Sequence, residues 1–416
     1  MNSKWKEVLI SEIGEVKSGK RLPLGHSLSE TPTRFPYIRL VDVADGRIQN
    51  QKLLYLDART REIIKRYVVN TSDVCLAIVG HTIGTVFYVD EDFDDVNLTE
   101  NAARITSFKA TVNPRYVYYY LTSPIGKTEI QARKVGSAQG KLPLHNIKSF
   151  PLSIPCRKIQ DEIVETLDSF NDRITLLRET NKTLESIAQA IFKSWFVDFD
   201  PVRAKMEGRQ PEGMDEETAA LFPDSFEESE LGSVPRGWLP IRLDSFLELA
   251  YGKALKADNR NAGAIPVYGS GGVTGWHDSA LCTSPSIIVG RKGTVGSLYW
   301  ESRPFFPIDT VFYVKAKRPM TYCYQLLKTL GLHDMNTDAA VPGLNRENVY
   351  RLKAPDIPSA VLKAFDATAK VLRQSVDHNE RRAQTLSSVR DTLLPRLISG
   401  QLRLPEAQEQ IENAPS

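Results

Sequence analysis

The side chains of this chain that could recognise another molecule are basic and amide groups on predicted loops. Such groups donate hydrogen bonds to phosphates and base edges in the grooves of double-stranded DNA. The alternative for each of them is an ordinary solvated surface residue. The candidates in the first half are Gly19, Lys20, Arg21, Arg39, His81, Gln139 and Lys141. Those in the second half are Gly252, Lys253, Arg291, Lys292, Asn345 and Arg346.

One short motif could suggest catalysis. Asn113-Pro114-Arg115-Tyr116 is similar to the Asn-Pro-Pro-Tyr loop with which adenine methyltransferases hold a flipped base. Arg115 replaces the second proline, however, and no glycine-rich loop for S-adenosylmethionine precedes the motif. The Asn-Pro step instead predicts the start of a helix whose tyrosines pack in a core. We therefore expect no methyl transfer by this chain itself.

Other patterns also argue against a catalytic or metal site. The glycine-rich segment 269–275 lacks the Lys-Thr ending of a phosphate-binding loop and is typical of a β-turn. The six histidines are scattered and no carboxylate cluster accompanies them, so neither a metal site nor a nuclease site is predicted. The four cysteines lack paired spacing, and we expect them to be reduced.

Length and composition predict a globular protein of two domains. The chain has 416 residues, of which 41% are hydrophobic and 25% charged. We expect no membrane segment or signal peptide, and hence a cytoplasmic location. The net charge is only +2, but residues 198–230 contain eleven acidic and three basic residues. That stretch carries −8 and leaves +10 on the remainder, a basic excess suited to phosphates.

The sequence contains an internal repeat. Eight residues near the start match identical or similar residues 233 positions later without a gap. They are Trp5, Val8, Ile10, Ile13, Glu15, Val16, Gly19 and Lys20, matched by Trp238, Ile241, Leu243, Phe246, Glu248, Leu249, Gly252 and Lys253. Short strand-like stretches ending in Gly80 and Gly290 also correspond. The two Gly-Lys pairs are thus the stronger candidates for DNA contact.

Each copy of the repeat ends in a long stretch with the apolar spacing of a helix. Apolar residues at alternating steps of three and four predict a seam between two helices, with one asparagine in each seam. A helix of about 40 residues is about 60 Å long, so the pair would act as a rod. Spacing alone does not distinguish parallel from antiparallel pairing. The pairing candidates are Ile174, Leu177, Asn181, Leu184, Leu372, Val376, Asn379 and Leu386.

A rod between two similar but unequal globular units suits the reading of a divided DNA site. At this point the chain resembles the specificity subunits of type I restriction-modification systems. The resemblance covers nearly the whole chain and lies in the segments Phe192–Gly208 and Leu393–Leu402, which follow the long helices. The blocks Pro266–Gly269 and Gly290–Gly293 also look like those of the family's target recognition domains.

The resemblance implies an α+β fold with a pseudo-twofold internal repeat. Two target recognition domains of mixed short strands and helices would be separated by two long conserved helices that form an antiparallel coiled coil. We expect the following division: recognition domain 1 at 1–155, spacer helix 1 at 156–198, an acidic linker at 199–236, recognition domain 2 at 237–357, spacer helix 2 at 358–400 and a tail at 401–416.

The resemblance also implies the partners. Each recognition domain would bind one half of an asymmetric, bipartite target in double-stranded DNA. The helices would set the spacing and dock two methyltransferase subunits, and restriction subunits would complete the complex. We expect no cofactor in this chain, with S-adenosylmethionine, ATP and Mg on the partner subunits. Two alternatives stay open: a self-contained DNA adenine methyltransferase or nuclease with similar recognition domains, and a coiled-coil protein that binds other proteins.

Overall fold

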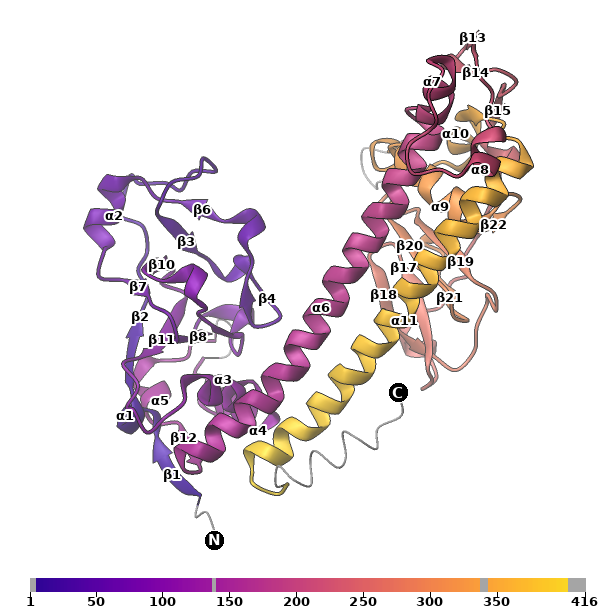
Figure 1. Cartoon of the computed structure of the whole chain (residues 1–416). Coiled ribbons are helices and arrows are strands. Elements are labelled where there is room, and N and C mark those ends of the chain that lie inside the picture. Colours follow the sequence, from indigo (N-terminus) through magenta and orange to yellow (C-terminus); the bar gives the residue numbers. More distant parts are fainter. Residues whose placement is uncertain (1–4, 137–139, 337–342, 403–416) are drawn as a thin grey trace. The chain divides into compact units, whose positions relative to one another are not determined.

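The computed structural model describes residues 5–136, 140–336 and 343–402. The chain divides into two compact units: unit 1 comprises Met1–Thr175 with Arg382–Ser416, and unit 2 comprises Leu176–Arg381. The divisions fall inside the two longest helices, α6 (Arg157–Phe196) and α11 (Ser359–Ile398). Each unit therefore holds part of both helices. Figure 1 draws α6 in magenta and α11 in orange to yellow. None of the helices in the described residues is long and apolar enough to cross a membrane.

Unit 1 is built around a sheet of four antiparallel strands. Their order is β2 (Glu15–Ser18), β11 (Ala102–Thr106), β8 (Val74–Ala77) and β9 (Val86–Tyr88). The two central strands are buried along their whole length, and β8 is accordingly apolar without alternation, whereas β11 contains the buried Arg104, which pairs with Asp73 at 3.3 Å. Helices α3 (Pro114–Thr122) and α4 (Pro124–Ala132) follow β11 along the chain.

The remaining elements of unit 1 surround this sheet. A second sheet has the order β6 (Leu54–Tyr55), β3 (Pro36–Ile38), β10 (Val96–Leu98) and β7 (Val68–Val69), in which β10 and β3 are parallel. Two further antiparallel pairs are β1 (Lys6–Leu9) with β12 (Pro151–Ile154), and β4 (Val43–Ala44) with β5 (Arg47–Ile48). The short helices are α1 (Ile10–Ile13), α2 (Ala58–Ile64) and α5 (Leu144–Lys148).

Unit 2 repeats the central arrangement. Its antiparallel sheet has the order β16 (Leu247–Tyr251), β22 (Val311–Ala316), β19 (Ser286–Gly290) and β20 (Leu298–Glu301). A smaller sheet contains β18 (Gly272–His277), β17 (Ile265–Gly269) and β21 (Phe306–Pro307). The pair β15 (Pro240–Arg242) with β23 (Lys353–Pro355) corresponds to β1 with β12. Helices α9 (Met320–Thr329) and α10 (Arg346–Arg351) occupy the places of α3 and α5 in the chain.

The same strand order in both units confirms the internal repeat and the α+β fold predicted from the sequence. The turn between β17 and β18 also confirms that the glycine-rich segment 269–275 belongs to a β-hairpin.

Each repeated tryptophan packs against the end of a long helix. In unit 2 the buried Trp238 ring lies 6.3 Å from the ring of Phe196, at the end of α6. In unit 1 Trp5 packs on a core that includes Leu397 and Leu402. A Cβ atom on Gly400 would lie 2.6 Å from the Trp5 ring, so the chain after α11 approaches this ring as closely as a glycine allows. The segments Phe192–Gly208 and Leu393–Leu402 thus serve to complete cores.

Within each unit the two long helices run antiparallel. In unit 2 Asn181 of α6 contacts Asn379 of α11. Phe192, which comes later in α6, contacts Phe365, which comes earlier in α11, with ring centroids 5.9 Å apart. In unit 1 Arg390 of α11 donates to Asn171 at 2.6 Å. Of the predicted pairing residues, Ile174, Asn181 and Val376 are buried, whereas Leu177, Leu184, Leu372, Asn379 and Leu386 are half-buried. Continuous coiled-coil packing stays a prediction.

The acidic segment 199–236, which we expected to act as a linker, is folded. It contains α7 (Asp200–Met206), α8 (Glu216–Ala220) and the hairpin of β13 (Phe226–Ser229) with β14 (Gly232–Pro235). Val202 and Phe222 are buried in the core around Trp238. The net charge of the segment was misleading, because its few large apolar side chains suffice to anchor it while the carboxylates stay near solvent.

The repeated glycines Gly19 and Gly252 lie where two backbones come together. A Cβ atom on Gly19 would lie 2.0 Å from the carbonyl oxygen of Thr99, and one on Gly252 would lie 2.1 Å from that of Ile308. Only glycine fits such an approach. Backbone packing therefore accounts for the recurrence of these glycines.

We expect Gly252→Ala to lower the free energy of unfolding by about 1–3 kcal/mol, the usual cost of forcing an extra methyl group into a packed site. Gly271→Ala is the matched control, because nothing lies within 4 Å of the added carbon. That variant should unfold within about 0.5 kcal/mol of the unmodified chain. Urea unfolding followed by circular dichroism compares the two; equal losses would contradict the close approach.

The asparagine pair gives a second prediction. Asn379 donates to Asn181 at 2.9 Å, and Asn181 donates to the carbonyl oxygen of Val376 at 3.2 Å. Replacing Asn379 by alanine leaves a buried amide oxygen without its donor, at an expected cost of about 1–3 kcal/mol. Replacing both asparagines by leucine removes the unmatched group, so its unfolding free energy should equal or exceed that of the unmodified chain. A double variant less stable than Asn379→Ala would show that the pair stabilises the helices.

Candidate nucleic-acid interface

Three of the predicted contact segments of unit 2 converge on one aromatic ring. Tyr251 is the last residue of β16 and is 49% exposed. The guanidinium carbons of Arg291 and Arg346 each lie 5.0 Å from the centre of its ring. Lys253 follows Tyr251 by two residues and is exposed. This group of residues, Tyr251, Lys253, Arg291, Lys292 and Arg346, is called the Tyr251 cluster below.

The fold holds both arginines of the Tyr251 cluster in place. Arg291 follows β19, and its Nη1 donates to the carbonyl oxygen of Asp309 at 2.9 Å. The backbone N–H groups of Arg291 and Lys292 both donate to the carbonyl oxygen of Thr310, at 2.9 and 3.0 Å. The Tyr251 ring in turn packs on Phe312 of β22, with centroids 5.0 Å apart. The cluster thus lies where β16 and β19 end, against the start of β22.

Arg346 begins α10, and its neighbour Asn345 caps that helix. The Asn345 side-chain oxygen accepts from the backbone N–H groups of Glu347 at 2.8 Å and Asn348 at 3.3 Å. This acceptor is therefore occupied by the helix end. The nearest carboxylate to the Nε of Arg346 is that of Glu347, at 3.8 Å, and this Nε is buried without a hydrogen-bond partner among the described residues. The Arg346 guanidinium thus lies beside Tyr251, and because its Nε is enclosed, a contact with DNA would have to come from its terminal nitrogens.

The Tyr251 cluster has the chemistry of a nucleic-acid contact. A guanidinium group is charged at all physiological pH values and can donate two parallel hydrogen bonds to guanine or to a phosphate. Lys253 and Lys292 are exposed and supply point charges for phosphates. Stacking on Tyr251 restricts the two guanidinium groups before any partner binds, which lowers the entropy lost on binding.

Unit 1 brings together the equivalent loops. The turn Gly80–Thr82 follows β8 and carries the exposed His81. The backbone N–H of Gly80 donates to Gly140 at 3.0 Å, beside the exposed Lys141. Leu142 donates to the Ile78 carbonyl at 2.9 Å, and in unit 2 Leu344 donates to that of Arg291 at 2.8 Å. Gln139 lies outside the described residues.

The other basic candidates of unit 1 already have partners. Lys20 is exposed, and its ammonium group lies 5.4 Å from the centre of the Tyr67 ring. Arg21 pairs with Glu100 at 2.7 Å and stays largely exposed. Arg39 donates to both carboxylate oxygens of the buried Asp42, at 2.9 and 2.7 Å. Arg39 therefore has a structural role, whereas the side chains of Lys20 and Arg21 remain exposed to solvent.

Sequence reasoning missed Tyr251. Its signal was its position immediately before the repeated Gly-Lys pair, where the equivalent residue in unit 1 is Ser18. The two units therefore present different chemistry at matched places: a ring between two guanidinium groups in unit 2 and a small hydroxyl in unit 1. Unequal surfaces of this kind suit two unequal half-sites.

The motif Asn113-Pro114-Arg115-Tyr116 opens helix α3, as predicted. The Asn113 side chain accepts from the backbone N–H of Arg115 at 2.9 Å, and Tyr116 is fully buried. Burial raises the pKa of the Tyr116 hydroxyl well above its ordinary value. Across the described ranges, no group of three or more histidine, cysteine or acidic side chains is arranged to hold a metal ion.

Comparisons with known proteins show which proteins the chain is similar to. Residues 2–186 match the family model of the type I restriction modification DNA specificity domain. The chain is 27% identical to the type I restriction enzyme HindI specificity subunit of Haemophilus influenzae, over 96% of this chain and 100% of the relative. It is 22% identical to the MjaIX specificity subunit of Methanocaldococcus jannaschii, over 97% and 94% of the two chains.

A solved structure shares the fold. The crystal structure of a type I restriction-modification S subunit from M. genitalium superposes with a TM-score of 0.54 at 18% identity, over 95% of this chain and 96% of that one. The similarity in sequence to specificity subunits extends over both copies of the repeat and both long helices. Over nearly its whole length the chain is therefore similar to the specificity subunits of type I restriction-modification systems.

Proposed function

We propose that this subunit reads a bipartite DNA target, with each globular part binding one half and the long helices setting the distance between them. The observation that carries the proposal is the Tyr251 cluster. Two arginines from separate segments lie beside its exposed ring, and the exposed Lys253 and Lys292 lie close in sequence to the ring and to one of these arginines. The equivalent loops of unit 1 carry other residues, so the two halves of the target would differ.

We also propose that chemistry takes place on partner subunits. Two methyltransferase subunits would dock on the long helices, and restriction subunits would complete the complex in the cytoplasm. S-adenosylmethionine, ATP and Mg would bind to those partners. The use of the Asn-Pro-Arg-Tyr motif as a helix start supports this division over a self-contained methyltransferase.

Arginine and lysine variants of the Tyr251 cluster test base reading against phosphate contact. Arg346→Gln should weaken binding to the specific target by about 1–3 kcal/mol and relax the sequence preference at one position. Lys253→Ala should weaken specific and non-specific DNA alike and reduce the slope of log affinity against log salt by about one. Fluorescence anisotropy with the full chain and its methyltransferase partner measures both quantities.

Lys109→Gln serves as the control for loss of a surface charge. Lys109 is exposed on the loop between β11 and α3, outside the Tyr251 cluster and away from the long helices in sequence. This variant should bind specific DNA like the unmodified chain. Unchanged affinity of both Arg346→Gln and Lys253→Ala at low salt would remove the cluster from the interface.

A further inference from the structure

In each unit the ion pairs of one arginine connect the globular fold to the long helices. These arginines are Arg115 in unit 1 and Arg373 in unit 2. Both are largely enclosed, with side chains 20% and 11% exposed. Neither lies among the predicted DNA contacts. Their partners show what they do.

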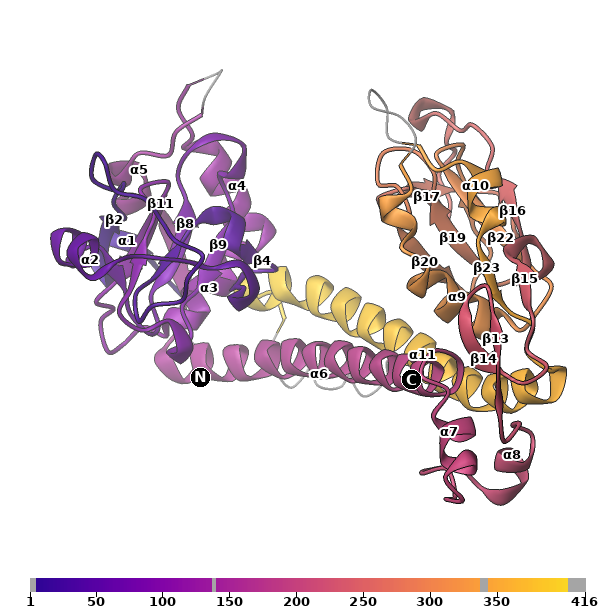
Figure 2. The same ribbon diagram turned by 90° about the horizontal axis from the view of Figure 1, so that it is seen from above.

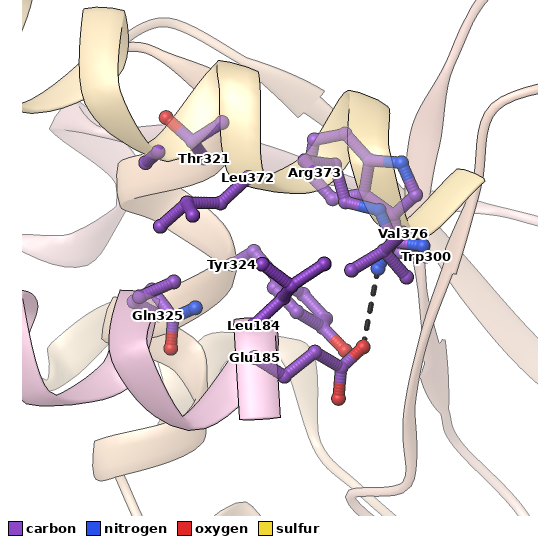
Figure 3. A pocket seen from close by; sticks show the side chains of 11 residues that line it. Leu184, Glu185, Trp300, Thr321, Tyr324, Gln325, Leu372, Arg373 and Val376 are labelled. Carbon is purple, nitrogen blue, oxygen red and sulfur yellow. Dashed lines mark hydrogen bonds and ion pairs between the residues drawn. The ribbon is translucent and has the colours of Figure 1, made fainter. Parts of the chain in front are cut away.

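Arg373 of α11 connects three elements of unit 2 (Figure 3). Its Nη1 pairs with Glu185 of α6 at 3.2 Å, and its Nη2 pairs with Asp377 of α11 at 2.7 Å. Its guanidinium carbon lies 5.7 Å from the centre of the Trp300 ring, which belongs to β20 at the edge of the sheet. One side chain thus links both helices to the recognition fold.

A second path reinforces the same connection. The indole Nε1 of Trp300 donates to Ser302 at 2.8 Å, and the Ser302 hydroxyl donates to the carboxylate of Asp377. Thr321 of α9 donates to Asp366 of α11. The end of β20 and the start of α9 are therefore both tied to α11 by directional hydrogen bonds.

Unit 1 contains a matching arrangement. Arg115 of α3 pairs with Asp168 of α6 at 2.8 Å and with Asp90, just after β9, at 3.1 Å. Its guanidinium carbon lies 4.6 Å from the centre of the Tyr88 ring, at the end of β9. The hydroxyl of Tyr119 also donates to Asp168. The strand β9 has the same edge position in its sheet as β20 has in unit 2.

In unit 1, too, hydrogen bonds connect the arrangement to the second long helix, α11. Asn171 of α6 donates to the Tyr119 hydroxyl at 2.8 Å and accepts from Arg390 of α11 at 2.6 Å. Both units therefore use the same parts: an arginine on the ring at the end of the edge strand, a carboxylate on a long helix, and a hydrogen bond that reaches the other helix. The residues come from different places in the two copies, but the connection is repeated.

Such polar contacts differ from apolar packing because they depend on direction. Apolar packing holds the folds on the helices but is non-directional, and it tolerates small rotations. A largely enclosed arginine with two carboxylate partners fixes an angle, since each charged hydrogen bond has a preferred geometry. Angle matters for a divided target, because each added base pair shifts the second half-site by about 3.4 Å and turns it by about 35°.

We propose that Arg115 and Arg373 are positioning residues that fix the angle of each recognition fold on its helices, and through it the spacer length that the subunit accepts. The inference rests on the proposed function, because it requires two half-sites to be read at once. Two side chains that do not contact DNA would then help to determine which spacer length the subunit binds. The length of the helices would be the other determinant of that spacer length.

The test measures affinity for DNA targets that differ only in the spacer. Each carries both half-sites, mapped beforehand from genomic methylation, with the native spacer or one base pair more or less. The full chain with its methyltransferase partner binds each in turn. For Arg373→Gln and Arg115→Gln we expect the preference for the native spacer to fall about tenfold, which corresponds to about 1.4 kcal/mol. Binding to a DNA with one half-site should stay unchanged.

Two further variants make the result specific. Arg373→Lys keeps the charge but loses the planar fork, so its spacer preference should lie between those of the unmodified chain and Arg373→Gln. Lys109→Gln, which removes an exposed charge outside the long helices, should leave the preference unchanged. If Arg373→Gln does not fold, as judged by circular dichroism, Arg115→Gln decides the question by itself.

The outcomes separate the two proposals. Unchanged spacer preference in folded variants would overturn the positioning role, as would an equal loss of affinity for every spacer and for the single half-site. An unmodified complex that binds one half-site as tightly as two would instead contradict the proposed bipartite reading.

Discussion

The structure depends on the burial of one face of each long helix in the core of a globular unit. A helix of 40 residues with a mostly polar surface gains little stability alone, so its stability comes from the apolar side chains that it buries. In unit 2 Phe192 and Phe196 of α6 pack around Trp238 and Phe365. In unit 1 Leu393 and Leu397 of α11 pack in the core to which Trp5 adds. Each unit is complete only when segments distant in sequence come together, and the repeated tryptophans mark where they meet.

This constraint places the proposed recognition surface and its supports on the same sheet. The repeated sheet carries the Tyr251 cluster at the end of β16 and after β19, while its edge strand β20 ends at the polar anchor of α11. Burial therefore determines which elements associate, and charged hydrogen bonds determine the angle at which they do so. The surface residues are left free to differ between the units, as Tyr251 and Ser18 do, without loss of the common frame.

Much of the frame could be predicted from the sequence, because it depends on local patterns. The repeat, the two long helices and the helix start at Asn113 follow from spacing and capping residues that act over a few positions. The Tyr251 cluster could not, since Arg291 and Arg346 meet the ring only through long-range pairing of strands. The anchoring role of Arg115 was hidden for the same reason: its partner Asp168 lies 53 residues away. The acidic segment was expected to be a linker because of its net charge, and the apolar Val202 and Phe222, which are buried, were not considered. The individual DNA contacts and the coiled-coil packing stay predictions.

The central claim is that one chain reads two separate half-sites at a fixed distance. Protection footprinting of a mapped target, with the methyltransferase partner present, tests it most directly. Two short protected patches separated by an unprotected gap of constant length are expected if each unit contacts one half-site, as we propose. A single continuous patch, or a gap that varies between targets, would contradict the account.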